Sequence, residues 1–188
     1  VPASLAFMVQ WLGISIDHKV ISPNGDRIFD ELNLSYNIDA NASVQMRVFT
    51  TNKASDGSLV PNPTPVRTIT VDQESGSGNI VWDGKDDSGS FVPDGTYQIT
   101  ARATDHCNNS NERTFIVDVD NAAPTTIIAY PKVESVIGNI VEIAGTANDD
   151  HLEYYTLEAG KGYAPDAWTL VTSKAAPVQN GVLGTWKT

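Results

Sequence analysis

The sequence has few of the residues that carry most catalytic and metal chemistry. One cysteine in 188 residues excludes an internal disulfide and a CxxC metal site, and three histidines leave little room for zinc. Basic residues are also scarce, since 12 of them against 23 acidic ones give a net charge of −11. Because nucleic acids and anionic membranes attract basic surfaces, this charge argues against both as partners.

The sequence also lacks a long apolar run. The longest uncharged stretch, residues 1–16, is interrupted by Gln10 and falls short of the ~20 apolar residues that a spanning helix needs. It has neither the basic start nor the small-residue cleavage site of a signal peptide. We therefore expect no membrane insertion. Because the sequence starts without Met and stops abruptly at Thr188, we interpret the chain as a piece of a longer protein.

Apolar side chains recur at every second position, which is typical of strands with one buried face. One such series is Leu32, Leu34, Tyr36 and Ile38. Turns rich in Gly, Pro, Asp and Asn separate the series. The strands predicted in this way lie near 14–20, 31–38, 43–51, 65–71, 78–82, 95–104 and 112–119. Seven strands in about 105 residues predict an all-β, immunoglobulin-like or fibronectin III-like β-sandwich, and Tyr97 at the start of the sixth strand resembles its tyrosine corner.

A short polar segment that ends in Pro124 predicts a domain boundary. After it the strand pattern restarts near 126–130, 139–145, 153–159, 167–173 and 182–187. Because a full sandwich needs ~100 residues, we expect a tandem pair of sandwiches in which the second is incomplete and truncated.

The predicted organisation has four parts. They are a leading segment (1–13), the first domain (14–120), a linker (121–124) and the second domain (125–188). We expect the leading segment either to come from a preceding module or to pack on the second domain. An incomplete sandwich exposes an unpaired edge, which we expect this segment or a neighbouring chain to cover.

Two stretches of the first domain resemble one bacterial family. Residues 21–30, ISPNGDRIFD, resemble its SPNGDGxxD opening, and residues 81–97, VWDGKDDSGSFVPDGTY, resemble its WDGxDxxGxxVPDGTY segment. The family is the immunoglobulin-like domain named after the flagellar hook-capping protein FlgD. Arg27 departs from the pattern, which favours glycine there, and this puts in doubt a turn with positive φ.

The second domain resembles another immunoglobulin-like repeat of large bacterial surface proteins. The similar stretches are 143–150, 155–158, 168–170 and 180–186. The two resemblances imply a non-catalytic structural or adhesive module pair of a bacterial cell-surface or secreted protein, which acts as a spacer or presents other domains. Its partners would be the neighbouring domains of the same protein and cell wall or polysaccharide. The alternative is an accessory substrate- or carbohydrate-binding module attached to a secreted enzyme.

Acidic side chains gather in loops that share one end of the predicted sandwich. These loops and the end of the last strand carry the candidate ligands Asn24, Asp26, Asp30, Asp83, Asp86, Asp87 and Asp120. Ca²⁺ takes about six to eight oxygen ligands, so one hypothesis is a structural calcium ion that stiffens the loops and the hinge. The other is that Asp and Asn hydrogen-bond their own turns without metal.

The pattern predicts no enzyme. His106 and Cys107 are sequence neighbours, and neighbours on an extended chain point apart. Carboxylate pairs such as Asp86 and Asp87 are also adjacent, which does not suit two groups that flank one scissile bond.

A carbohydrate platform needs several exposed aromatic rings. We expect Trp82, Trp168 and Trp186 to lie in the core. Tyr163, in a loop with glycine and proline, is the one ring that we expect to be exposed. One ring makes no platform, so sugar binding remains the less favoured function.

Overall fold

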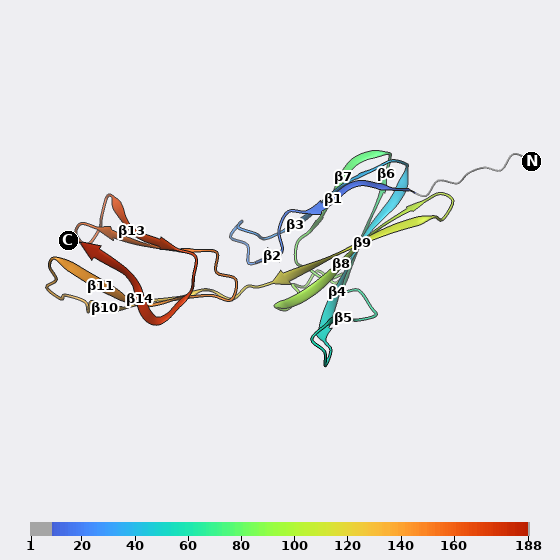
Figure 1. Ribbon diagram of the computed structural model, residues 1–188. Coiled ribbons are helices and arrows are strands. Elements are labelled where there is room, and N and C mark those ends of the chain that lie inside the picture. The colour runs from blue at the N-terminus through green and yellow to red at the C-terminus, as the bar shows by residue number, and fades with distance from the viewer. Residues whose placement is uncertain (1–8, 188) are drawn as a thin grey trace, which may run out of the picture. The chain divides into compact units, whose positions relative to one another are not determined.

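The computed structural model describes residues 9–187. The chain divides into two compact units, residues 1–121 (unit 1) and 122–188 (unit 2). All the regular structure of the described residues is β-strand (Figure 1), which confirms the all-β prediction. None of the described residues forms a helix long and apolar enough to span a membrane.

Unit 1 is a two-sheet sandwich of nine strands. They are β1 (Trp11–Ile16), β2 (Val20–Ile21), β3 (Leu32–Ile38), β4 (Ala42–Lys53), β5 (Leu59–Pro61), β6 (Arg67–Gln73), β7 (Gly76–Trp82), β8 (Gly95–Asp105) and β9 (Ser110–Val119). One sheet has the order β1-β3-β7 and the other β2-β9-β8-β4-β5, with β6 also paired to β4. The two sheets face each other across the core (Figure 1).

The core of unit 1 consists of the alternating residues that the sequence pattern singles out. Leu32, Leu34 and Ile38 of β3 are at most 1% exposed. The facing strand β4 contributes Val44 and Met46, both fully buried. Burial of each such side chain stabilises the fold by roughly 1.5–3 kcal/mol. With nineteen buried apolar residues, unit 1 has a continuous core of its own.

The first predicted strand, 14–20, is in fact two strands in different sheets. β1 pairs antiparallel with β3, whereas β2 pairs in parallel with β9. The break falls at Asp17, whose carboxylate accepts the backbone N–H and the side-chain amide of Asn33, each at 2.9 Å. After these bonds the chain leaves its pairing with β3 and continues in the other sheet as β2.

The predicted boundary after residue 13 is also wrong, because β1 begins at Trp11 and Val9 is fully buried in the core of unit 1. Residues 9–13 therefore belong to the first sandwich. Residues 1–8 of the predicted leading segment lie outside the described residues.

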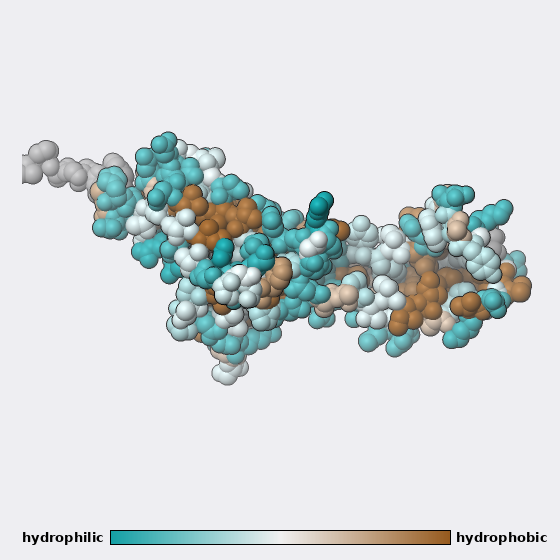
Figure 2. Space-filling view, turned by 180° about the vertical axis from the view of Figure 1, so that it is seen from behind, coloured by the Kyte–Doolittle hydropathy of each residue, from teal (hydrophilic) through white to brown (hydrophobic). Residues whose placement is uncertain are grey.

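Unit 2 contains five strands in two smaller sheets. They are β10 (Thr125–Tyr130), β11 (Ile140–Asn148), β12 (Tyr155–Gly160), β13 (Trp168–Lys174) and β14 (Val178–Lys187). The sheet orders are β10-β11-β14 and β12-β13. Its core cluster has three buried residues, Val141, Ile143 and Leu157. Apolar side chains consequently lie at the surface of this unit (Figure 2).

Candidate functional site at the loop end of the first unit

The loop of residues 22–30 is built around the carboxylate of Asp30. Its Oδ1 accepts the backbone N–H groups of Asn24 at 3.1 Å and Gly25 at 2.9 Å. Its Oδ2 accepts the N–H of Arg27 at 2.8 Å. These bonds, that from Gly25 above all, hold the pKa of Asp30 below its usual value. The carboxylate thus satisfies backbone donors that have no strand partner.

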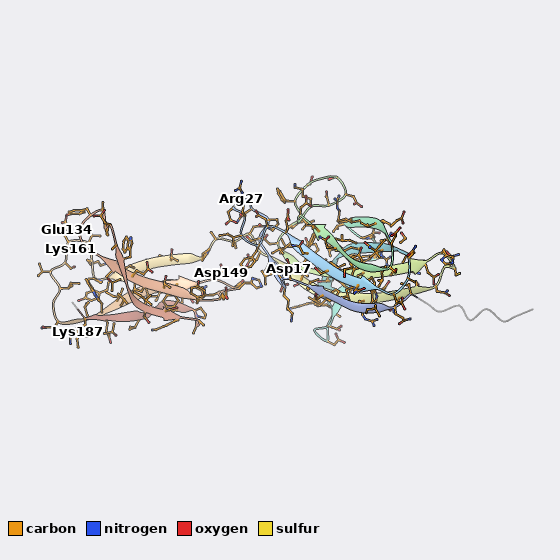
Figure 3. All side chains as sticks on the ribbon, turned by 90° about the horizontal axis from the view of Figure 1, so that it is seen from above. Asp17, Arg27, Glu134, Asp149, Lys161 and Lys187 are labelled. Carbon is orange, nitrogen blue, oxygen red and sulfur yellow. The ribbon has the colours of Figure 1, made fainter. Side chains whose placement is uncertain are left out.

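Asn24 and Asp26 each close a turn within the same loop. Asn24 Oδ1 accepts the N–H of Asp26 at 3.0 Å, and Asp26 Oδ1 accepts the N–H of Ile28 at 2.8 Å. Arg27, which Figure 3 shows on this loop, adopts a φ of 71°. The positive φ is therefore present although arginine replaces the glycine of the family pattern, at a cost of about 1–2 kcal/mol for a side chain in this region.

The second acidic loop, residues 83–94, contains a turn centred on Asp86. Asp86 Oδ1 accepts the Ser88 hydroxyl at 2.7 Å, and the N–H groups of Ser88 and Ser90 at 2.9 Å each. The bond from the Ser88 hydroxyl is the largest of the effects that hold the pKa of Asp86 below its usual value.

The neighbouring carboxylates of this loop contact other partners. Asp87 Oδ1 accepts the N–H of Thr68 at 3.1 Å and lies 3.6 Å from the guanidinium of Arg67. Asp83 lies 3.2 Å from the ammonium group of Lys85. Asp87 therefore joins the loop to β6, whereas Asp83 acts within the loop. The carboxylates of Asp86 and Asp87, although adjacent in sequence, contact different partners.

The two loops touch each other at Pro23 and Gly84. A Cβ atom on Gly84 would lie 2.4 Å from Pro23 Cγ, and Gly84 has a φ of +69°. Both the close approach and the backbone conformation require glycine. The contact brings the two acidic loops to the same end of the sandwich, as the sequence predicts.

The last strand of unit 1, β9, ends at this same end of the sandwich, and hydrogen bonds hold the chain through its final residues. The N–H of Asp118 donates to Lys19 O at 2.9 Å, and that of Asp120 donates to Ile21 O at 3.0 Å. Asn121 donates its backbone N–H and its side-chain amide to Asp94 Oδ1, at 3.1 and 2.8 Å. We call the loops 22–30 and 83–94 and the end of β9 the loop end of unit 1.

The seven predicted calcium ligands are brought to one end, but their carboxylates do not form one tight group. In the described part of unit 1, no three of the carboxylates of Asp26, Asp30, Asp83, Asp86 and Asp87 have oxygens within 4.8 Å of one another. The hydrogen bonds given above are those expected if Asp and Asn side chains bond to their own turns without metal. Calcium binding by Asn24, these aspartates and Asp120 stays a prediction.

Sequence reasoning missed two polar contacts of this region. Asp94 stands in the sequence only as part of the segment 81–97, and its bond to Asn121 joins positions 27 apart. The Asp17–Asn33 pair likewise links two strands. Neither partner stands out by spacing or by residue type, because the sequence does not show which loops meet.

Two aromatic residues of the segment 81–97 donate hydrogen bonds to the loop 83–94. Tyr97 is 2% exposed, and its hydroxyl donates to Pro93 O at 2.6 Å, which confirms the tyrosine corner. Burial, together with the charge of Asp94, raises the pKa of this phenol. Trp82 is fully buried, as predicted, and its Nε1–H donates to Lys85 O at 2.8 Å.

His106 and Cys107 lie in the exposed turn between β8 and β9. This turn is organised by Asp105, whose Oδ1 accepts the N–H groups of Cys107 at 2.8 Å and Asn109 at 2.9 Å. Its arrangement is that of a hairpin turn. His18, on another loop, packs edge-on against Phe29 at 4.7 Å between ring centroids.

The aromatic residues of unit 2 differ from the prediction. Trp168 was expected in the core but is 60% exposed, because its ring lies beside Gly160 and Pro165 on the β12–β13 hairpin. Tyr163 is fully exposed, as predicted, but it is not alone, since Tyr130 and Tyr154 are at least half exposed. Trp186 is partly buried and packs on the core cluster.

The two facing sheets, the alternating core and the tyrosine corner define unit 1 as an immunoglobulin-like β-sandwich. Within this class, residues 30–106 match the family model described as the FlgD Ig-like domain. Unit 1 is therefore similar to the FlgD Ig-like domain over these residues. The similarity of unit 2 to a second immunoglobulin-like repeat stays a prediction.

Solved structures with similarity to the chain include FlgD from P. aeruginosa, which is 25% identical, with a TM-score of 0.34 over 47% of this chain and 61% of that one. A family 76 glycoside hydrolase from a bovine Bacteroides thetaiotaomicron strain is 10% identical, with a TM-score of 0.36 over 57% of this chain and 20% of that one. The β-glucosidase EmGH1 from Erythrobacter marinus is 13% identical, with a TM-score of 0.35 over 60% and 15%. The chain thus spans less than two thirds of each of these proteins. Among curated proteins, no match is found.

Proposed function

We propose that the chain is a non-catalytic structural module pair of a bacterial cell-surface or secreted protein, in which unit 1 acts as a spacer between neighbouring domains. The observation that carries this proposal is the path of the chain through unit 1. The chain comes in at one end of the sandwich and leaves at the other, and hydrogen bonds hold it at both ends.

The incoming chain is held beside the end of β3. Gln10 donates its N–H to Asp39 Oδ1 at 2.7 Å, and Asp39 donates its N–H to Gln10 O at 3.3 Å. Asp39 directly follows Ile38, which pairs with Gly76 at the start of β7. The opposite end of β3, at Leu32, adjoins the loop end of unit 1.

The outgoing chain is held at that loop end by Asp94 and Ile21, as described above. β2 and β9 run parallel to each other. Tension applied between Gln10 and Asn121 pulls these two strands in opposite directions along their length. The bonds Asp118 N–H to Lys19 O and Asp120 N–H to Ile21 O then carry load together instead of opening one by one. This arrangement suits a module that transmits force.

Single-molecule stretching of the full chain tests the proposal. Asp120→Pro removes the N–H that donates to Ile21 O, and the preceding Val119 is already in a strand conformation that a following proline tolerates. We expect a lower unfolding force for unit 1. In EDTA, which removes any contribution of calcium, the matched variant Asp120→Ala keeps the N–H and should unfold near the wild-type force. Equal forces for both variants and the wild type would contradict a load-bearing β2–β9 contact.

Calcium enters this proposal as an additional source of stiffness at the loop end. Its support is the number of acidic and amide oxygens that the two touching loops bring to one end of a chain with a net charge of −11. Carboxylates held near one another repel unless they are solvated or bridged by a cation. The ion would bind to oxygen lone pairs that the turn hydrogen bonds do not use.

A second candidate function is carbohydrate binding by unit 2, as an accessory module beside a secreted enzyme. The observation that favours it is the exposure of Trp168 and Tyr163 on one hairpin, because exposed rings stack on sugar faces. A pull-down with insoluble polysaccharides tests it. Binding should be lost in Trp168→Ala and kept in Phe91→Ala, which removes an equally exposed ring from unit 1. Absence of binding by the wild type would leave the spacer function alone.

A further inference from the structure

One of the two sheets of unit 1 carries no charge. Its three strands, β1, β3 and β7, contain no charged residue. In the other sheet, the strands β4, β6, β8 and β9 each contain at least two. The chain has a net charge of −11, so two copies repel each other where their charges meet. Because salt largely screens charges more than about 10 Å apart, a second copy can approach unit 1 along the uncharged sheet.

Four of the five edge strands in the described part of unit 1 are protected against pairing with a further strand. Proteins protect such edges with charges, with proline or with very short strands. β2 has two residues, β5 contains Pro61, and β6 contains Arg67 and Asp72. The edge of β7 is covered at Ser77, whose carbonyl oxygen accepts the side-chain amide of Gln73 at 3.5 Å.

The fifth edge strand, β1, has none of this protection. Within residues 9–187 it pairs only with β3. It has six residues and contains neither proline nor a charged side chain. A bulge lies at its start, where Leu12 is 66% exposed, and residues 13–16 then pair with β3 in regular register. This regular part offers an open hydrogen-bond ladder to an additional strand.

The free backbone groups of this ladder belong to Ile14 and Ile16. Just after β1, the N–H of Asp17 donates to Asn33 O at 3.1 Å. In an antiparallel ladder, every second residue bonds to the same neighbouring strand. Residues 13, 15 and 17 therefore bond to β3, whereas Ile14 and Ile16 direct their N–H and C=O groups to the open side.

We propose that two copies of the chain pair through β1, antiparallel to each other and around a two-fold axis at Ile14. The two Ile14 residues then exchange both of their N–H to O bonds. The two uncharged sheets join into one sheet of six strands. The contact is isologous, so it forms closed pairs of chains and no longer assemblies.

The sequence of β1 is its own complement in this register. Ser15 of each copy lies opposite Gly13 of the other, so every side chain stays on its own face of the joined sheet. The exposed Leu12 comes to lie beside Ile16 of the second copy. The first charged residue after β1, Asp17, lies at the far end of the contact from its own counterpart. This complementarity favours a second copy over an unrelated strand as the occupant of the edge.

Sedimentation equilibrium of the full chain over a range of concentrations tests the pairing. The wild type should form pairs of chains, and Ile14→Pro should stay single, because proline removes an N–H that one chain alone does not use. The matched variant Ile14→Ala loses comparable packing but keeps the N–H, so it should still pair. Circular dichroism confirms that each variant is folded. The proposal is overturned if the wild type stays a single chain at every concentration, or if Ile14→Pro pairs as Ile14→Ala does.

Disulfide trapping tests the register independently of the affinity. The background is Cys107→Ser, because Cys107 is an exposed free thiol. Gly13→Cys is tolerated, since open space surrounds its Cβ position. Residues opposite each other in a pair without hydrogen bonds have Cα atoms about 4.5 Å apart, within the range of a disulfide. A mixture of Gly13→Cys and Ser15→Cys chains should therefore cross-link under mild oxidation, and neither variant should do so alone.

The control mixture combines Ser15→Cys with Val60→Cys, an exposed position on the protected edge strand β5. It should stay uncross-linked. Cross-linking of this control at the rate of the Gly13→Cys and Ser15→Cys mixture would overturn the proposed register, because thiols would then meet by random collision. Absence of cross-linking in both mixtures would overturn it as well.

Discussion

Single carboxylates organise the loop end of unit 1. Asp30 accepts three backbone N–H groups and Asp86 accepts two together with a hydroxyl. An ionised carboxylate accepts hydrogen bonds more strongly than a protonated one. The order of these loops therefore depends on the charge of individual residues, which is consistent with the lowered pKa values of both groups.

The pH dependence of stability follows from this charge. Because folding lowers the pKa of Asp30, its contribution is present above about pH 3.9, the value for an unfolded aspartate, and is lost as the pH falls through the folded value. Asp30→Asn should therefore lower the melting temperature at pH 7, and its difference from the wild type should shrink below about pH 4. Thermal melts by circular dichroism between neutral pH and pH 2.5 check this.

The control for that series is Asp72→Asn, which changes an exposed aspartate of β6 outside the loop end. Its melting curve should follow that of the wild type at every pH. A difference between Asp30→Asn and the wild type that stays constant down to the lowest pH would show that the charge of Asp30 is not what holds the loop.

Substitution of single aspartates also tests calcium binding. If the loop end binds the ion in the folded state only, millimolar CaCl₂ should raise the melting temperature by several degrees over that in EDTA, in proportion to RT ln(1 + [Ca²⁺]/Kd). The rise should be lost in Asp26→Asn and in Asp87→Asn. An unchanged melting temperature, with no heat of binding in calorimetry, would leave the hydrogen bonds as the source of stiffness.

Among the elements of the fold, the two acidic loops depend on each other through the contact of Pro23 with Gly84. Gly84→Ala should destabilise unit 1 for two reasons, its positive φ and the clash with Pro23. Gly89→Ala separates the backbone contribution from the steric one, because Gly89 has a φ of +85° and open space around its Cβ position. We expect about 1–2 kcal/mol for Gly89→Ala from the backbone alone. Gly84→Ala should cost about 1–3 kcal/mol more from overpacking.

Urea unfolding of both glycine variants provides the measurement. The difference between them isolates the steric contribution of the loop contact. Equal losses would mean that Pro23 moves aside without cost and that the loops are not coupled through this contact.

Most elements of the fold can be predicted from the sequence because their signal is local. Alternation such as that of Leu32 to Ile38 reflects one buried face, and the PDG turn before Tyr97 fixes where β8 begins. The change of sheet between β1 and β2 could not be predicted, because it depends on Asp17 meeting Asn33, 16 positions away. The exposure of Trp168 could not be predicted either, for a different reason. Its alternation is that of a buried strand, but it lies beside Gly160 and Pro165 on its own hairpin.

The candidate site, too, could be predicted from the sequence only in part. The convergence of the loops follows from strand order, and the sequence predicts it. The use of each carboxylate depends on distances of a few ångströms between loops, as in the Asp94–Asn121 contact, and no spacing in the sequence encodes them.

For the molecule as a whole, the two units differ in the size of their cores. Unit 1 buries nineteen apolar residues in one cluster, and the cluster of unit 2 has three. We therefore expect unit 2 to unfold at the lower temperature. Leu157→Ala should lower or abolish only that transition, at a cost of about 2–5 kcal/mol, and Met46→Ala should lower only the upper one. Scanning calorimetry resolves the two transitions. A single transition that both variants shift would show that the units unfold together.

The path of the chain through unit 1 has a consequence for how proteins containing it lengthen. Because the chain comes in beside Asp39 and departs beside Asp94, a gene that duplicates this segment adds one fixed increment of length with each copy. No copy has to alter its sequence to accommodate the next. For a spacer of the kind proposed above, gain and loss of repeats, instead of substitution within them, is then the simplest route by which a lineage adjusts the distance between the neighbouring domains.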